Sequence, residues 1–243
     1  MKTRNAPRDP IGPAAGLGHL LSLYRDCSLG FRLFVAHRWW HARLSEVESL
    51  VPESGLILDL GCGHGVVANL MGMRSSTRRV IGFERDGRKA AIGRGRLSNV
   101  EIRTCDVLRA DLPPADVVSI IDVLHHLESP RAQQLLLEKA VACLGNTGVL
   151  VVKEVTRSRP LRFRATLVLD RLAYPRDRFY FLRHEELHQG LEGRGLSVEM
   201  IPLWRRTPYA HYAMVCRRPG KAMTSVRHRR MEQPGSAQDG FSG

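Results

Sequence analysis

The sequence has few aromatic residues and few cysteines, and it has no long apolar run. Phe, Trp and Tyr make up 6% of its 243 residues, so a hydrophobic core must consist mainly of Leu, Val, Ile and Ala. No stretch approaches the roughly 20 apolar residues of a membrane span, and the N-terminus lacks the apolar segment of a secretory signal. The cysteines form no C-x-x-C pair, which argues against a disulfide framework and against a metal centre. They are Cys27, Cys62, Cys105, Cys143 and Cys216. We therefore expect a cytoplasmic protein with reduced thiols.

Acidic residues are scarce relative to basic ones. Asp and Glu number 24 against 37 Lys and Arg, which gives a formal net charge of +13. Such a charge suits a nucleic acid, an anionic membrane surface or an acidic substrate, and it also arises from charged tails. The basic residues are spread along the chain and occur at both ends, so they define no single patch. The charge alone leaves the partner open.

The order of predicted elements is typical of an α/β protein. Residues 1–18 are rich in Pro and Gly and are expected to be poorly ordered, whereas apolar spacings of three and four over residues 19–50 predict a helical cap. Strands and helices then alternate over residues 51–218, and residues 219–243 form a polar, basic tail that we expect to be disordered. The pattern predicts a doubly wound, Rossmann-like, mostly parallel sheet with a lid insertion before the last strands.

The individual strands and helices follow from apolar runs and breakers. Helices are predicted from residue 66 onward, over 87–97, over 129–144 with Ser129 as N-cap, and over 183–196. Strands are predicted at 56–60, 78–84, 100–106, 116–122, 148–155, 197–204 and 209–218.

The stretch LILDLGCGHG is the most informative part of the sequence. Its apolar strand carries Asp59 near its end. Three glycines follow at alternate positions, Gly61, Gly63 and Gly65. They let the backbone turn tightly and approach a ligand, while the amides of the next helix favour an anion. The dinucleotide fingerprint would need a glycine at Val66, and Asp59 would repel a pyrophosphate. Asp59 instead suits an ammonium group, so the pattern favours a zwitterionic ligand.

This loop resembles motif I of the class I S-adenosylmethionine-dependent methyltransferases, whose cofactor is such a zwitterion. Three later segments resemble further motifs of that family in the same order. They are VIGFERD at 80–86, RTCDVL at 103–108 and DVVSIIDVLHHL at 116–127. The resemblance covers roughly residues 50–155 and is greatest to the small-molecule and lipid branch (methyltransferase type 11/12-like). It implies S-adenosylmethionine as the cofactor.

Carried over residue by residue, the resemblance also implies the cofactor contacts. Glu84 ends the second strand, where the family's acid binds the ribose hydroxyls, and Asp106 and Val107 would lie beside the adenine. The full implied set is Asp59, Gly61, Cys62, Gly63, Gly65, Glu84, Arg85, Asp106, Val107 and Asp122.

Two adjacent histidines are the candidate general bases. His125 and His126 follow the fourth strand, at the edge where an acceptor would lie, and a neutral imidazole can accept a proton from a hydroxyl or an amine. We favour His125 because it leaves the strand first, and we expect His126 to pack under the next helix. Each ring also has a structural interpretation, as a cap or packing group. Candidates for lining the acceptor pocket, each of which also suits a structural role, are Arg38, Glu154, Tyr209 and His211.

Residues 157–183 form the predicted lid. Apolar and basic residues interleave there, namely Phe163, Leu167 and Leu172 with Arg162, Arg164 and Arg171. The pattern suits a lid helix with a solvated basic face. It also suits a helix in peripheral contact with a membrane interface.

The sequence therefore predicts a methyltransferase that acts on a small-molecule or lipid-like acceptor. An RNA methyltransferase is the alternative that the charge permits. We find no appended RNA-binding module, no aromatic stacking platform and no N/D-P-P-Y/F signature, since residues 122–125 are DVLH. A non-catalytic protein that keeps the fold is disfavoured by the intact set of Asp59, Glu84 and Asp106. The acceptor, the methylated atom and the oligomeric state stay open.

Overall fold

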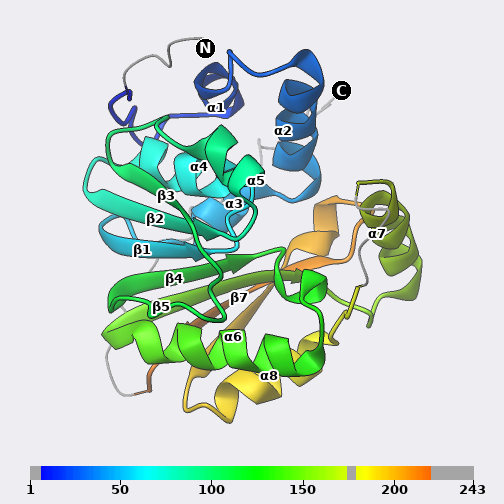
Figure 1. Ribbon diagram of the computed structural model, residues 1–243. Coiled ribbons are helices and arrows are strands. Elements are labelled where there is room, and N and C mark those ends of the chain that lie inside the picture. The colour runs from blue at the N-terminus through cyan, green and yellow to red at the C-terminus, as the bar shows by residue number, and fades with distance from the viewer. Residues whose placement is uncertain (1–6, 174–178, 220–243) are drawn as a thin grey trace, which may run out of the picture.

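In the computed structural model, which describes residues 7–173 and 179–219, a seven-stranded sheet runs through the molecule (Figure 1). The strands are β1 (Gly55–Leu60), β2 (Arg78–Glu84), β3 (Val100–Thr104), β4 (Ala115–Ile121), β5 (Leu144–Val155), β6 (Ser197–Pro202) and β7 (His211–Arg217). Their order is β3-β2-β1-β4-β5-β7-β6, and every pairing is parallel except the two that β7 makes. The strand order reverses between β1 and β4, and ligands of open α/β sheets bind at the carboxyl ends of the strands at such a point. The predicted fold class is confirmed.

Helices cover both faces of the sheet. Figure 1 shows α1 to α5 on one face and α6 and α8 on the other, with α2 and α7 on the side of the molecule where β1, β4 and β5 end. The helices are α1 (Leu17–Leu23), α2 (Leu29–His41), α3 (Leu44–Glu48), α4 (Val66–Arg74), α5 (Gly87–Gly93), α6 (Pro130–Cys143), α7 (Pro160–Ala173) and α8 (His184–Glu192). A short 3-10 turn, η1 (Leu124–His126), follows β4, and another, η2 (Leu203–Arg206), precedes β7.

Local sequence signals explain most element ends. Ser129 caps α6 as predicted, because its hydroxyl accepts a hydrogen bond from the Ala132 amide at 3.2 Å. The helix predicted over 87–97 ends earlier, at Gly93, and the chain turns at Gly95 with φ +69°. The strand predicted over 148–155 starts earlier, at Leu144, because the preceding Gly-Asn-Thr-Gly stretch continues the extended chain.

The N-terminal segment differs from the expectation for residues 1–18. The amides of Ile11 and Gly12 donate to the carbonyl of Met73 at 2.8 and 3.0 Å, and Ala15 is buried. The described part of this segment, from residue 7 onward, therefore packs along the end of α4, whose last carbonyls lack helical partners. The expectations for residues 1–6 and 220–243 lie outside the described residues.

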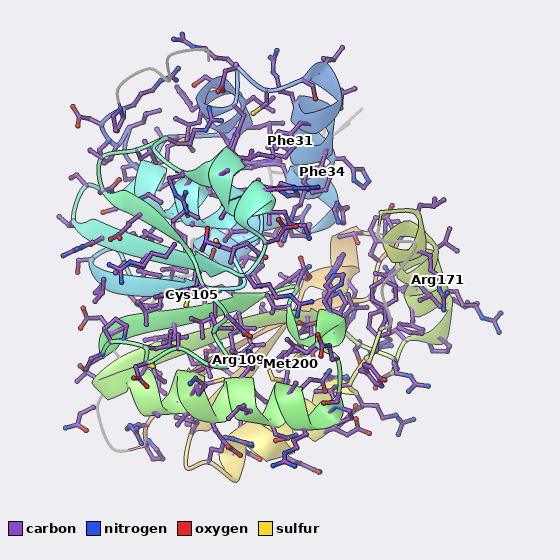
Figure 2. All side chains as sticks on the ribbon, viewed as in Figure 1. Phe31, Phe34, Cys105, Arg109, Arg171 and Met200 are labelled. Atoms are coloured by element: carbon purple, nitrogen blue, oxygen red, sulfur yellow. The ribbon has the colours of Figure 1, made fainter. Side chains whose placement is uncertain are left out.

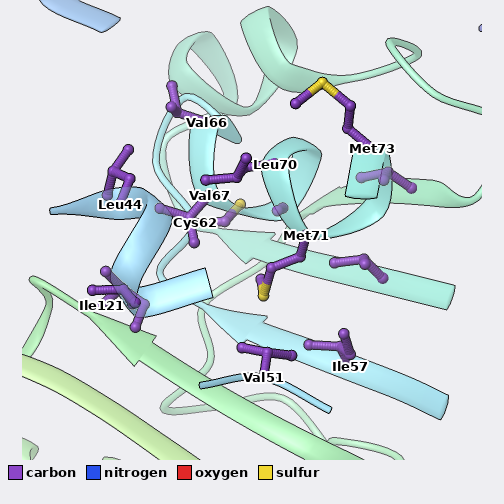
Figure 3. Close-up of a cluster of buried hydrophobic side chains, with 14 of the residues drawn as sticks. Leu44, Val51, Ile57, Cys62, Val66, Val67, Leu70, Met71, Met73 and Ile121 are labelled. Carbon is purple, nitrogen blue, oxygen red and sulfur yellow. The ribbon is translucent and has the colours of Figure 1, made fainter. Parts of the chain in front are cut away.

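The core is built mainly of aliphatic side chains, as the composition requires. Under α4, one cluster joins Ile57 of β1, Met71 of α4 and Ile121 of β4 with Leu44 of α3 (Figure 3). A second cluster fills the opposite face of the sheet beneath α6 and α8. The two clusters hold the sheet rigid, and the carboxyl ends of its strands form the base of the site.

A buried ion-pair network ties the helical cap to the sheet. The Glu48 carboxylate, which is 4% exposed, accepts hydrogen bonds from Arg74 and Arg78, each at 2.5 Å. Arg78 also donates to the backbone carbonyls of Val51 and Met71, at 2.8 and 2.9 Å. All donors of this guanidinium are buried, so its charge depends on Glu48.

We expect Glu48→Ala to lower the free energy of unfolding by about 3–5 kcal/mol, because it leaves the buried Arg78 charge without its counter-ion. Urea denaturation would measure the change. Glu46→Ala on the same helix is the matched control: Glu46 pairs with Arg43 at a partly exposed position, so we expect a loss of at most about 1 kcal/mol. Equal losses in the two variants would contradict the role assigned to Glu48.

Candidate functional site

The loop after β1 is held in a conformation that only glycine adopts easily. Gly61, Gly63 and Gly65 have φ of +79°, +56° and +70°. A Cβ on Gly65 would lie 2.9 Å from the Cα of Gly93 in α5, so the two backbones touch. A Cβ on Gly63 would meet no atom of the described residues within 4 Å. The loop is therefore tightly packed on one side and open on the side where Gly63 lies.

The N-terminal helices clamp this loop. The Tyr24 hydroxyl is fully buried, accepts from Asn69 Nδ2 at 3.1 Å and donates to the His64 carbonyl at 3.3 Å. Phe31 and Phe34 are labelled on α2 in Figure 2. Their ring centroids lie 5.2 and 5.6 Å from that of His64. The cap and the glycine loop thus form one packed unit.

Asp59 has one buried carboxylate oxygen that lacks a partner. Its Oδ1 accepts from the Ser119 hydroxyl at 2.8 Å, whereas Oδ2 has no hydrogen-bond partner among the described residues. Burial raises the pKa of Asp59 to about 6, although the Ser119 hydrogen bond and the charge of Arg38 oppose the rise. A buried, unsatisfied carboxylate oxygen is costly, so this position suits a ligand that donates a hydrogen bond and carries positive charge.

Glu84 and Asp106 lie at the ends of β2 and β3. Glu84 Oε2 accepts from the Gly63 amide at 2.9 Å, and its Oε1 accepts from the Asp86 amide at 2.8 Å. Glu84 therefore contacts the open part of the glycine loop directly. Asp106 Oδ1 accepts from the Leu108 amide at 3.0 Å, which fixes the turn after β3.

Three other residues of the implied cofactor set lie differently. Arg85 is exposed and pairs with Glu128 at 3.1 Å, so its side chain points along the surface. The side chains of Cys62 and Val107 are buried in the two core clusters. Burial raises the pKa of the Cys62 thiol well above its ordinary value. A cofactor would meet Cys62 and Val107 through their backbones.

Asp122 is the centre of an ion-pair cluster where β4 ends. It has a left-handed backbone, with φ +57°, and its carboxylate contacts Lys153 of β5 and, at 3.4 Å, Arg38 of α2. Burial alone would raise the pKa of Asp122, but the charges of Lys153 and Arg38 outweigh burial and hold it well below its ordinary value. Arg38 thereby ties α2 to the sheet edge.

Lys153 also orients a histidine. Its fully buried ammonium donates to His211 Nδ1 at 2.8 Å, so His211 carries its own hydrogen on Nε2 when Lys153 is charged. That Nε2 is buried and has no hydrogen-bond partner among the described residues. Burial and the charge of Lys153 lower the pKa of His211 well below its usual range, and they lower that of the adjacent His41 to about 4. Both rings are neutral at pH 7.

Glu154 and His125 form the other pair at this edge. Glu154 Oε1 accepts from the amides of Val123 and Leu124 at 3.0 and 2.7 Å, and its Oε2 lies 2.5 Å from His125 Nδ1. The carboxylate fixes the turn after β4 and places the proton of a neutral His125 on Nδ1. Phe181 stacks on the His125 ring at 5.0 Å between centroids, and the ring is 3% exposed.

His126 lies beside His125 but in other surroundings. Its ring centroid is 4.3 Å from that of His125 and 5.2 Å from that of Phe179. These two contacts are with its neighbour in the chain and with the segment before α8; packing of His126 under α6 stays a prediction. Burial is the main cause that lowers the pKa of His126, and a positive charge on His125 would lower it further. The His126 ring is therefore neutral.

The structure brings most predicted site residues to one edge of the sheet and adds others. Tyr209 lies 5.7 Å from His41 and 5.9 Å from His211 between ring centroids, beside the Asp122 cluster. The sequence analysis missed Lys153 and His41. A lysine inside the apolar strand VLVVKEV was an available signal, because a buried lysine needs a partner. His41 gave no signal, since it follows the ordinary pattern of a surface helix.

These features fit S-adenosylmethionine. The unsatisfied Asp59 Oδ2 would accept from the ammonium group, the open side of Gly63 leaves room for the ligand, and Glu84 would accept from the ribose hydroxyls. Asp106 and the Val107 backbone lie at the end of the neighbouring strand, as the implied adenine contacts require.

Comparison with known proteins agrees with this geometry. A family model described as "Methyltransferase domain" matches residues 33–201. The ubiquinone biosynthesis O-methyltransferase of Azotobacter vinelandii is 29% identical over 119 residues, which cover 40% of this chain and 50% of that protein. The chain thus spans about half the length of this curated relative.

Solved structures share the fold. The mitomycin 7-O-methyltransferase has a TM-score of 0.61 at 20% identity, over 82% of this chain and 60% of that one. An S-adenosylmethionine-dependent methyltransferase from Thermotoga maritima also has a TM-score of 0.61 at 20% identity, over 82% of this chain and 99% of that one. At these identities the likeness concerns the fold. The family match covers more than half of the sequence, and this chain therefore belongs to the methyltransferase domain family.

Proposed function

We propose that the protein transfers a methyl group from S-adenosylmethionine to a hydroxyl group of a small-molecule or lipid-like acceptor. The observation that carries this proposal is the arrangement at one sheet edge. An open glycine loop and the unsatisfied Asp59 oxygen lie beside β4. His125 follows β4, and it pairs with Glu154 near the end of β5.

Cofactor binding rests on residues of the first three strands. Asp59 accepts from the ammonium group, the amides after Gly63 face the carboxylate, and Glu84 holds the ribose. The bound sulfonium supplies an activated methyl group, so the protein has no leaving group to protonate. Its main task is to align the acceptor oxygen, and orientation of this kind contributes roughly 7–11 kcal/mol.

The base is His125 in this proposal. A hydroxyl is a weak nucleophile until it loses its proton, whereas a neutral amine is nucleophilic enough to attack before it loses one, so an oriented base favours an oxygen acceptor. Glu154 keeps the proton on Nδ1 and stabilises the imidazolium that forms when Nε2 accepts a second one. Because Phe181 covers the ring, the segment that carries Phe181 has to shift when the acceptor enters.

We propose that the acceptor binds between α2 and β7. Arg38, Tyr209 and His211 were expected there, and His41 joins them. His211 Nε2 would donate to an oxygen of the acceptor, which would satisfy a buried group that otherwise lacks a partner. Glu154 acts through His125 and is a positioning residue.

The names of the relatives support a small-molecule acceptor over RNA. The curated relative is named for ubiquinone biosynthesis, and one structural neighbour methylates position 7 of mitomycin by its name. Neither name concerns RNA. Labelled methyl transfer from S-adenosylmethionine to a panel of alkyl-substituted phenols and catechols, with total RNA in parallel, tests the proposal. Incorporation into RNA alone would overturn it.

We expect Gly63→Leu to abolish S-adenosylmethionine binding while the protein stays folded. The side chain would occupy the approach path of the ligand, whereas its clash with the protein is small. Gly95→Leu is a matched control, because Gly95 also has a positive φ and open space around a Cβ but lies outside the loop. Both variants bear a left-handed backbone strain of roughly 1–2 kcal/mol. Calorimetric binding retained in Gly63→Leu would mean that the loop is only a turn.

We expect cofactor affinity to fall as the pH drops below about 6, because Asp59 then takes up a proton and no longer attracts the ammonium group. Affinity should also fall above the ~7.7–8.0 pKa of an α-amino group, where the ligand loses its charge. Calorimetry over a pH series measures both limbs. Asp59→Asn should bind more weakly at pH 7 and lose the acid limb. A wild-type affinity that is constant from pH 7 to 5 would contradict this role.

We expect His125→Ala to lower turnover by roughly 10²–10⁴-fold and to leave the dissociation constant of the cofactor unchanged. His126→Ala is the neighbouring control and should keep most of the turnover. Steady-state rates with an identified acceptor, together with cofactor binding, provide the two readouts. Full turnover in both variants would show that catalysis rests on alignment alone and that the histidines are structural.

A further inference from the structure

Two helices expose apolar stripes on the side of the molecule where the site lies. On α2 the exposed large apolar residues are Leu29, Leu33 and Trp40, at 69%, 60% and 64% exposure. On α7 they are Leu161, Val168 and Leu172, at 80%, 61% and 76%. We call these the α2 stripe and the α7 stripe.

Each stripe lies on one face of its helix. The three residues of the α2 stripe are four and seven positions apart, and those of the α7 stripe are seven and four apart. On a helix of 3.6 residues per turn, such steps return to nearly the same angle around the axis. The opposite face of α2 is occupied, since Phe31 and Phe34 contact the glycine loop. On α7, Arg162 donates to the carbonyl of Trp204, and Thr166 is buried. The stripes are therefore the outward faces of both helices.

Arginines accompany the α7 stripe. Arg164 and Arg171 are exposed on the same side of α7 as the stripe, and Arg171 lies on the outer side of the helix (Figure 2). Arg157 and Arg159, just before the helix, are also exposed. Residues 157–173 contain five arginines and one acidic residue. An apolar stripe flanked by arginines is the pattern of a helix that lies in a membrane interface, with its cations at the headgroups.

The position of the stripes fits this partner. Figure 1 shows α2 and α7 on the same side of the molecule, at the carboxyl edge of the sheet. That edge carries the Asp122 cluster and His125. If the protein bound a bilayer through this side, the entrance to its proposed acceptor pocket would face the lipid. Among the described residues no helix is both long and apolar enough to cross the bilayer, so the contact is one of docking.

We propose that the α2 and α7 stripes, with the arginines of α7, dock this protein on an anionic phospholipid surface. The charge selects the partner: a second copy of this chain would bring like charges together at α7, whereas anionic headgroups complement them. This proposal goes beyond the proposed function, and its test requires neither cofactor nor acceptor.

The test is co-sedimentation of the full-length protein with vesicles of phosphatidylcholine alone and of phosphatidylcholine mixed with phosphatidylglycerol. We expect the wild type to partition onto the mixed vesicles and to be released by salt. The triple variant Leu161→Gln, Val168→Gln, Leu172→Gln should reduce the partition coefficient about tenfold or more. Leu135→Gln is the matched control, because Leu135 is an exposed leucine of α6, at 40%, on another side of the molecule.

Charge variants and fluorescence complete the test. Arg164→Glu with Arg171→Glu should remove the preference for phosphatidylglycerol, while Arg131→Glu on α6 should keep it. The Trp40 indole should move to a less polar environment, so the emission of the wild type should shift to the blue on mixed vesicles and that of Trp40→Phe should not. Thermal melting confirms that each variant is folded.

Three outcomes would overturn the proposal. Unchanged vesicle binding in the α7 triple variant and the double charge variant would place the contact elsewhere, for example in the basic residues 220–243. A wild type that sediments as a dimer and an α7 triple variant that sediments as a monomer would make the stripes a self-association surface. Failure of the wild type to bind either vesicle would exclude the docking itself, and it would leave the proposed methyl transfer unaffected.

Discussion

The site depends on which cations or hydrogen-bond donors stabilise three carboxylates where neighbouring parallel strands end. Asp59 on β1, Asp122 after β4 and Glu154 on β5 are all buried or nearly so, and each would be costly if ionised without a partner. Asp122 is neutralised by Lys153 and Arg38, and Glu154 is hydrogen-bonded to two backbone amides and His125. Among the described residues, the hydrogen-bond partner of Asp59 is the Ser119 hydroxyl alone, and no ion pair joins Asp59 to a cation. The uncompensated carboxylate is the one beside the open glycine loop.

These compensations also assemble the walls of the site. Arg38 belongs to the helical cap, so its ion pair with Asp122 brings α2 to the edge of the sheet. Glu154 fixes the turn that carries His125, and the His125 ring in turn supports Phe181 before α8. Elements that lie far apart in the sequence therefore meet where a buried carboxylate has its ion-pair or hydrogen-bond partner.

Neutral histidines gather around Lys153, which is fully buried. His41 and His211 stay uncharged because burial and the ammonium of Lys153 disfavour a second positive charge. The proposed acceptor pocket would thus offer imidazole donors and acceptors without added charge on those rings, even though the whole chain carries +13. Much of the remaining positive charge lies outside the site, including the arginines near α7. The net positive charge of the chain therefore does not determine the protonation of the histidines in the site.

The sequence by itself determined the sheet, the glycine loop and the cofactor class. Two local patterns carried this information: apolar residues that recur with the period of a strand or a helix, and glycines at alternate positions after a strand. Both patterns involve residues that are close together in the sequence. Asp59, Glu84 and Asp106 could be named because each stands at a predicted strand end. Only the tertiary structure decided that Lys153 orients His211, that His41 joins them and that Tyr24 clamps the loop, because these contacts join residues separated by 40 to 112 positions. Burial, which sets the protonation of these groups, likewise appears only when the chain has folded.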